Sequence, residues 1–168
     1  MAQPRPARYV FREVEEDDLP MIATWLAEPH VAQWWGDPDT EIAQIRDHMD
    51  SISVEPLIVE LRGEPIAYLQ SYDPHLEDDH PYQDQPFGTV GIDLMIGPAE
   101  MIDLGHGSAV LRQFVDELFA EGTLRVIADP DPANVRAIRA YEKAGFETFD
   151  TRISVYGPAL MMALDAEE

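Results

Sequence analysis

The last third of the chain holds two helix-forming segments in a fixed order, and that order constrains the fold more than any other feature. A glycine-rich turn, residues 104–109, opens a run in which apolar residues recur at i, i+3 and i+4. A β-prone run at 125–128 follows, and then Asn134 leads into a second helical run that ends near Gly145. A glycine turn before a helix exposes backbone N–H groups that can bind phosphate, and the alternative is an ordinary helix cap. The pattern predicts a phosphate-bearing cofactor, with Asn134 and Tyr141 holding the rest of it.

Strand-like and helix-like runs alternate along the whole chain, which predicts one mixed α/β domain over residues 1–168, with residues 1–7 flexible. Strands are expected at 9–14, 57–61, 66–72, 89–96 and 125–128 and twice within 146–164, and helices at 19–29, 40–49, after the glycine turn, and at 133–143. The runs 57–61 and 66–72 flank a short turn and should form an antiparallel hairpin. Prolines and acidic residues predict that 73–87 is a surface loop.

The net charge of −22, from 33 acidic and 11 basic residues, is the most unusual property of the composition. It argues against nucleic acid as a partner, because binding nucleic acid needs a cationic surface. A solvated acidic surface would explain the charge, and so would an acidic cleft that attracts a polycationic small molecule. The two explanations are compatible.

Several classes of site and location are disfavoured by what the chain lacks. There is no cysteine, which excludes disulfides, thiolate metal sites and cysteine nucleophiles. His75 and His80 lie among acidic residues, but their spacing fits no regular metal site, so no metal is expected. No apolar run reaches the roughly 20 residues that span a bilayer, and no signal peptide is evident. The expectation is a cytoplasmic protein, monomeric or homodimeric, that does not bind membranes.

The glycine turn, G-x-G-x-A, and the later N-x-x-A-x-x-x-Y-E-K-A-G-F segment resemble the GNAT superfamily of acetyl-coenzyme A-dependent N-acetyltransferases. The resemblance implies a mixed, mostly antiparallel central sheet flanked by helices, with a splayed parallel pair of strands at the acetyl-CoA site. It implies acetyl-CoA as co-substrate, held by Leu94, Ile96, Leu104, Gly105, His106, Gly107, Ser108, Ala109, Asn134 and Tyr141. In the family, this turn usually begins with Gln or Arg, whereas here it begins with Leu104. The residue at this position contributes mainly its backbone to the cofactor site.

A closer resemblance covers residues 9–162. The segments Trp25-Leu26, His30 to Gly36, Gly63 to Tyr72, Gly91-Ile92-Asp93 and Asp129-Pro130 look like those of aminoglycoside 6′-N-acetyltransferases. The implied reaction is direct transfer of an acetyl group, in a ternary complex, to the 6′-amine of an aminoglycoside. Such an activity confers antibiotic resistance or is the environmental precursor of a resistance activity.

Asp93 is the leading catalytic candidate. It interrupts an otherwise apolar strand, 92–96, where a carboxylate is costly unless it faces a polar cleft or is paired. A protonated amine must lose a proton before it can attack a thioester, and a carboxylate can serve as the general base. The alternative is an aspartate on the outer face of a half-exposed strand. By resemblance, Asp93 matches the family's strand aspartate.

Tyr141 is the second catalytic candidate. It follows Asn134 by seven residues, about two helical turns, and so shares its face. By resemblance it lies near the sulfur and can protonate the leaving thiolate, and a backbone N–H near Leu94 would meet the oxyanion. The alternative is a tyrosine that only packs its ring on the sheet.

Trp34, Trp35, Tyr72 and Asp129 are predicted to bind the acceptor. By resemblance Asp129 positions the amine, although an aspartate before a proline also commonly starts a turn. Two adjacent tryptophans can form a flat wall against sugar rings, or they can be core and lid anchors.

Three other functions remain open. One is a siderophore-biosynthesis N-acyltransferase acting on N6-hydroxylysine, whose relatives share a similar His-x-x-x-Trp-Trp region but usually place His where this chain has Asp93. Another is a GNAT enzyme with a different small polyamine-like substrate. The third is a non-catalytic acyl-CoA-binding module, which would have no reason to keep a carboxylate in that strand.

Overall fold

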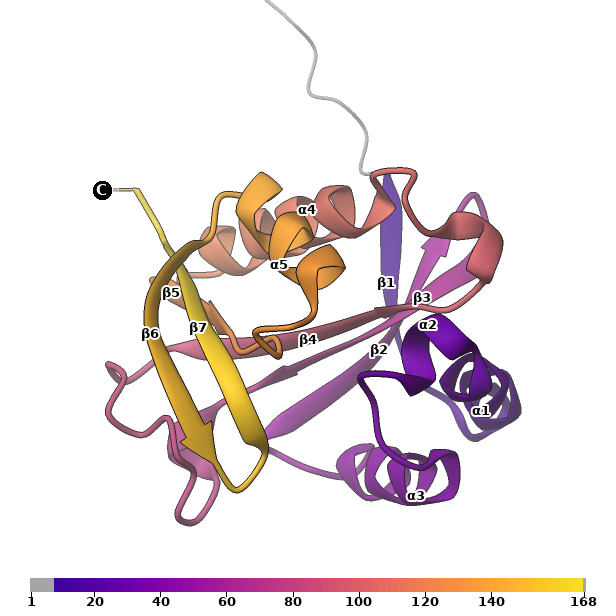
Figure 1. Cartoon of the computed structure of the whole chain (residues 1–168), viewed down its shortest axis with the longest axis horizontal. Helices are drawn as coiled ribbons and strands as arrows, with labels where there is room; N and C mark the ends of the chain where they lie inside the picture. The colour runs from indigo at the N-terminus through magenta and orange to yellow at the C-terminus, as the bar shows by residue number, and fades with distance from the viewer. Residues whose placement is uncertain (1–7, 168) are drawn as a thin grey trace, which may run out of the picture.

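The protein is described by a computed structural model over residues 8–167, in which a seven-stranded sheet has helices on both faces (Figure 1). The predicted flexible segment 1–7 lies outside these residues. The strand order is β1-β2-β3-β4-β5-β7-β6. The strands are β1 (Tyr9–Glu13), β2 (Val54–Leu61), β3 (Glu64–Tyr72), β4 (Val90–Ile96), β5 (Arg125–Ala128), β6 (Glu147–Ser154) and β7 (Gly157–Asp165). The α-helices are α1 (Leu19–Ala27), α2 (Pro29–Ala32), α3 (Pro38–His48), α4 (His106–Ala120) and α5 (Val135–Lys143), and the 3-10 helices are η1 (Glu16–Asp18), η2 (Pro74–Leu76) and η3 (Ala99–Met101).

The central pair of strands separates where the two halves of the sheet meet. Neighbouring strands run antiparallel except β4 and β5, which are parallel. β4 and β5 pair only at Val90 with Val126 and at Gly91 with Ile127. Beyond Gly91, β4 keeps only β3 as a paired neighbour. The sheet therefore confirms the predicted mixed, mostly antiparallel fold with a splayed parallel pair.

Two apolar clusters cover opposite faces of the sheet, because successive side chains of a strand point to opposite sides. Leu57, Val59 and Leu69 pack with α4 and α5, whereas Ile58 and Tyr68 pack with α1 and α3. Along β4, Ile92 belongs to the first cluster and Met95 to the second. Asp93 is two residues before Met95 in the same strand, so its side chain points to the same face, the one that α1 and α3 cover.

The hairpin prediction is confirmed, since β2 and β3 pair antiparallel, but β2 begins earlier than expected, at Val54, and includes Pro56. α3 likewise begins at Pro38, because the carboxylate of Asp37 accepts a hydrogen bond from the Thr40 amide and caps the helix. α1 ends at Ala27, and Pro29 begins the separate short helix α2. Most of these differences concern the ends of elements, and at α3 the cap decides the boundary.

The prediction of a surface loop at 73–87 is wrong for part of the segment. Tyr82 is only 1% exposed, and His80 and Gln85 are also buried. The hydroxyl of Tyr82 donates to Asp129 Oδ2 at 2.6 Å, and Arg152 of β6 pairs with Asp84 at 2.7 Å. The segment therefore folds inward against the ends of β5 and β6.

Within residues 8–167, none of the helices is both long enough and apolar enough to cross a membrane. In the same range, His, Cys, Asp and Glu side chains nowhere gather in a group of three or more suited to a metal ion.

Candidate active site

Two cavities meet at the point where β4 and β5 diverge. The first, here called the acidic cavity, has a volume of about 630 Å³ and lies beside β3, β4, α3 and the end of β5. The second, here called the glycine-turn groove, has a volume of about 570 Å³ and runs between β4, the 105–108 turn and α5. Both are lined by the same six residues at their junction: Trp34, Trp35, Leu94, Asn134, Ala137 and Tyr141.

Backbone amides of the glycine turn line part of the glycine-turn groove. Gly105 takes a left-handed conformation with φ of 86°, which an L side chain would strain, and it caps the start of α4. The first N–H groups of a helix have no partner within it. Gly105, Gly107 and Ser108 line the groove, and a methyl group added at Gly107 would lie 3.5 Å from the Ala140 side chain. The turn can therefore approach a phosphate closely.

Three residues of the predicted cofactor segment are placed differently from the rest. The Ala109 amide donates to the Gly105 carbonyl at 3.2 Å, so this N–H belongs to the helix and is not free for phosphate. His106 is buried, and its Nδ1 is 2.9 Å from the Tyr9 hydroxyl. Leu104 is 63% exposed and outside the groove lining. Leu94 and Ile96 line the groove from β4.

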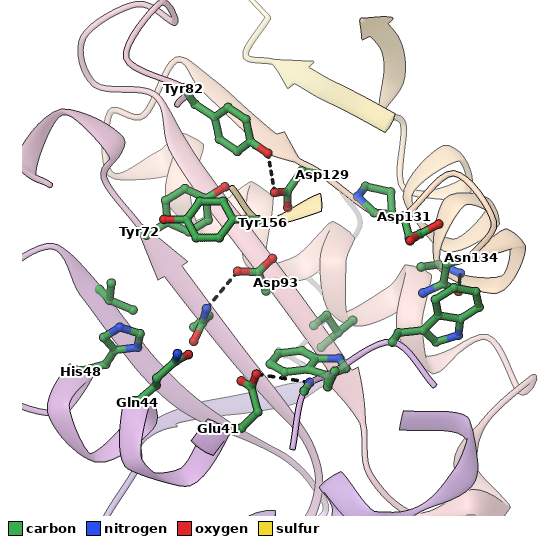
Figure 2. Close-up of a pocket in the computed structure, with 18 of the residues that line it drawn as sticks. Glu41, Gln44, His48, Tyr72, Tyr82, Asp93, Asp129, Asp131, Asn134 and Tyr156 are labelled. Carbon is green, nitrogen blue, oxygen red and sulfur yellow. Dashed lines mark hydrogen bonds between the residues drawn. The ribbon is translucent and has the colours of Figure 1, made fainter. Parts of the chain in front are cut away.

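Asp93 lies on the floor of the acidic cavity (Figure 2). Its Oδ2 accepts a hydrogen bond of 2.9 Å from the Gln70 side-chain amide, and Gln70 in turn accepts one of 2.7 Å from the Tyr68 hydroxyl. The two side chains fix the carboxylate from β3, which pairs with β4 through Gln70 and Asp93 themselves. Asp93 therefore faces a cavity that an acceptor can enter, and it is not an outward surface residue.

The environment of Asp93 favours its neutral form. Burial, followed by the charge of Asp129, raises the pKa of Asp93 to about 7. Burial also raises the pKa of Asp129, although the Tyr82 hydrogen bond acts in the opposite direction. A carboxyl group with a pKa close to neutrality is suited to general base catalysis, because it can both take up and release a proton.

Asn134 and Tyr141 stand at the junction of the two cavities, on the face of α5 that the spacing predicted. The side-chain oxygen of Asn134 accepts from the Ala137 amide at 3.2 Å and so caps α5. Burial raises the pKa of Tyr141 well above its usual value. Tyr141 therefore keeps its proton at neutral pH, so its hydroxyl can donate a hydrogen bond.

Aromatic side chains form much of the remaining wall. Trp34 and Trp35 are both half-buried, and Trp35 packs edge-on against Tyr68 with ring centroids 6.0 Å apart. Tyr72 and Tyr156 also line the acidic cavity, and Tyr156 comes from the turn between β6 and β7. The predicted acceptor-binding residues Trp34, Trp35, Tyr72 and Asp129 all line this cavity.

Several lining residues were not predicted from the sequence, among them Gln70 and Tyr156. A stripe of polar residues on α3, Glu41, Gln44 and His48, also faces the acidic cavity (Figure 2). Their i, i+3, i+7 spacing places them on one face of the helix and was a readable signal. Together with Glu77, Asp93, Asp129 and Asp131, Glu41 gives the cavity five carboxylates and no lysine or arginine among the described lining residues. The wall therefore suits a polycation.

The comparisons with known proteins agree with this geometry. Residues 14–152 match the family model described as acetyltransferase (GNAT) domain. The chain is 36% identical to aminoglycoside N(6′)-acetyltransferase type 1 of Klebsiella pneumoniae over 160 residues, which cover 90% of this chain and 80% of that protein. It is 30% identical to the lysine N-acyltransferase MbtK of Mycolicibacterium paratuberculosis, covering 94% of this chain and 74% of that protein.

Solved structures give the same result. The crystal structure of the aminoglycoside acetyltransferase AAC(6′)-Ib in complex with coenzyme A and kanamycin is similar with a TM-score of 0.84 at 35% identity, over 94% of each chain. Another structure of AAC(6′)-Ib contains acetyl-CoA. With the glycine turn, the splayed strands and the matched residues together, the chain belongs to the GNAT acetyltransferase family.

Proposed function

We propose that this protein transfers the acetyl group of acetyl-CoA to the 6′-amine of an aminoglycoside by direct attack in a ternary complex. The observation that carries the proposal is the junction of an acidic cavity, with Asp93 on its floor, and a groove lined by free amides. The similarity to aminoglycoside N(6′)-acetyltransferase type 1 supports the choice of acceptor. When bound in the groove, acetyl-CoA supplies the thioester carbon that the amine attacks.

The residues at the junction have separate tasks in this proposal. Asp93 takes a proton from the substrate ammonium, and Asp129 holds the amine nearby by charge. A bond then forms between the amine nitrogen and the acetyl carbon, and the bond from that carbon to sulfur breaks. Tyr141 gives its proton to the departing sulfur. In balance, the ammonium loses two protons, the sulfur gains one, and one leaves to solvent.

The lysine N-acyltransferase activity is the main competing function, because MbtK is also similar to this chain. Asp93 weighs against it, since relatives of that type usually have histidine at this strand position. The five carboxylates of the acidic cavity weigh in the same direction, because an aminoglycoside carries several ammonium groups.

Thiol release from acetyl-CoA, measured over a panel of acceptors, tests the proposed function. We expect turnover with kanamycin and tobramycin and none above background with an aminoglycoside that carries a hydroxyl in place of the 6′-amine. N6-hydroxylysine and spermidine serve as competing acceptors. Turnover with either of these and not with the drugs would overturn the aminoglycoside proposal.

The pH dependence of kcat/KM provides a second test. Asp93 acts as a base only when it is deprotonated, and its pKa is raised to about 7. We therefore expect kcat/KM for kanamycin to rise about tenfold per pH unit below pH 7 and then to level off. A bound ammonium favours the charged carboxylate, so the inflection in kcat should lie at a lower pH. A profile that is flat between pH 5.5 and 7.5 would exclude Asp93 as the base.

A further inference from the structure

Three of the basic residues in this acidic chain lie along one cavity. Arg136, Arg139 and Lys143 of α5 line the glycine-turn groove, where Asp103 is the one carboxylate within the described lining. The acidic cavity next to it has no lysine or arginine among its described lining residues. With 33 acidic and only 11 basic residues in the chain, this distribution indicates an anion in the groove.

Two of these cations have no acidic partner. Arg136 pairs with Asp103, with Nε and Oδ1 3.0 Å apart. Arg139 and Lys143 make no ion pair with any residue between 8 and 167. They are four residues apart on α5, and like charges at this spacing destabilise a helix slightly. Lys143 gains from the negative end of the helix dipole, but Arg139 lies outside the last turn.

The position of each residue along α5 indicates which part of acetyl-CoA it meets. Asn134 and Ala137 lie at the junction with the acidic cavity, where the acetyl group must be. Ala140 lies against Gly107, at the turn whose free amides suit the pyrophosphate. Lys143 is six residues beyond Ala137, about 9 Å along the axis at 1.5 Å per residue, and Arg139 flanks Ala140. Beyond the pyrophosphate, coenzyme A carries one more phosphate, the 3′-phosphate of its ribose.

We infer that Arg139 and Lys143 bind the 3′-phosphate of acetyl-CoA and make the enzyme select this donor over acetyl-3′-dephospho-CoA. The inference rests on the proposed acetyl-CoA-dependent function. Both side chains are exposed, so solvent screens them and their effect is smaller than that of a buried pair. Arg139 contributes a planar guanidinium that can bind phosphate through two hydrogen bonds, and Lys143 contributes a compact charge.

Kinetics with the two donors test the inference, because they differ only in the 3′-phosphate. We expect wild-type kcat/KM to favour acetyl-CoA about tenfold or more, in line with hydrogen bonds to charged groups. The double variant Arg139→Ala/Lys143→Ala should lose most of this preference through a higher KM for acetyl-CoA. Its kcat at saturating donor and its KM for kanamycin should stay unchanged. The control Arg46→Ala/Arg62→Ala removes the same charge outside the groove and should keep the preference.

The other outcomes separate the possible roles. An equal loss with both donors would mean that the cations serve the pyrophosphate, and the inference would be wrong. A double variant that keeps the wild-type preference would also overturn it. Calorimetric binding of CoA and 3′-dephospho-CoA needs no acceptor, so it tests the inference even if no aminoglycoside is acetylated. In that case the proposed acceptor is wrong, and the binding data alone decide whether Arg139 and Lys143 bind the 3′-phosphate.

Discussion

Replacing Asp93 with asparagine is expected to lower kcat for kanamycin about 10²- to 10⁴-fold, the range that a positioned general base contributes. Asparagine keeps the size of the side chain and can still bond to Gln70, but it cannot accept the proton of the substrate ammonium. Steady-state thiol release gives the measurement. The dissociation constant of coenzyme A, measured by calorimetry, should stay within about twofold of wild type. Asp93 lines the acidic cavity but not the glycine-turn groove.

A matched control separates catalysis from charge. Glu77 also lines the acidic cavity, so Glu77→Gln removes one negative charge from the same wall without touching the floor. We expect this variant to raise the KM for kanamycin and to leave kcat nearly unchanged. If Asp93→Asn had near-normal kcat, or fell no further than Glu77→Gln, Asp93 would act only as part of the negative wall.

Replacing Gly91 with alanine is expected to destabilise the fold by about 3 kcal/mol, at the upper end of typical overpacking effects. A methyl group at this position would lie 2.0 Å from a ring carbon of Tyr72, which is buried on the neighbouring strand. The ring must move, and it forms part of the acidic cavity. Thermal unfolding should show a midpoint lower by about 6–12 °C, with a higher KM for kanamycin in the surviving enzyme.

Two further variants check that the effect arises from this contact. Gly107→Ala makes the same change where the nearest neighbour, Ala140, is 3.5 Å away, and its unfolding midpoint should shift little. The double variant Gly91→Ala/Tyr72→Ala should be more stable than the sum of the two single losses predicts, because the clash is gone. Strict additivity of the two changes would show that the ring does not cause the destabilisation.

Local patterns in the sequence were sufficient for most of the fold. Strand and helix periodicity located the main elements, and part of the glycine turn, Asn134 and Tyr141 line one groove together. The strand context of Asp93 predicted that it would face a polar cleft. These features depend on neighbours within a few residues, or on period-2 and period-3.6 spacing, and so they are visible in a single sequence.

What the sequence did not show depends on contacts between distant segments. Composition made 73–87 look like a surface loop, but Tyr82 is buried because it reaches Asp129, 47 residues later. His106 fits a phosphate turn, yet its ring bonds to Tyr9, 97 residues earlier. Gln70 acquires its role only through the register of β3 with β4. Pairings of this kind follow from the assembled sheet and not from any local pattern.

The division of the molecule into two cavities that share only six lining residues also has an evolutionary consequence. Substitutions on α3, on the 73–87 segment or at the β6–β7 turn can reshape what the enzyme accepts while donor binding is preserved. Changes at the six shared positions alter both partners at once. Such an architecture lets a lineage acquire new acceptors step by step, with one acyl donor kept throughout.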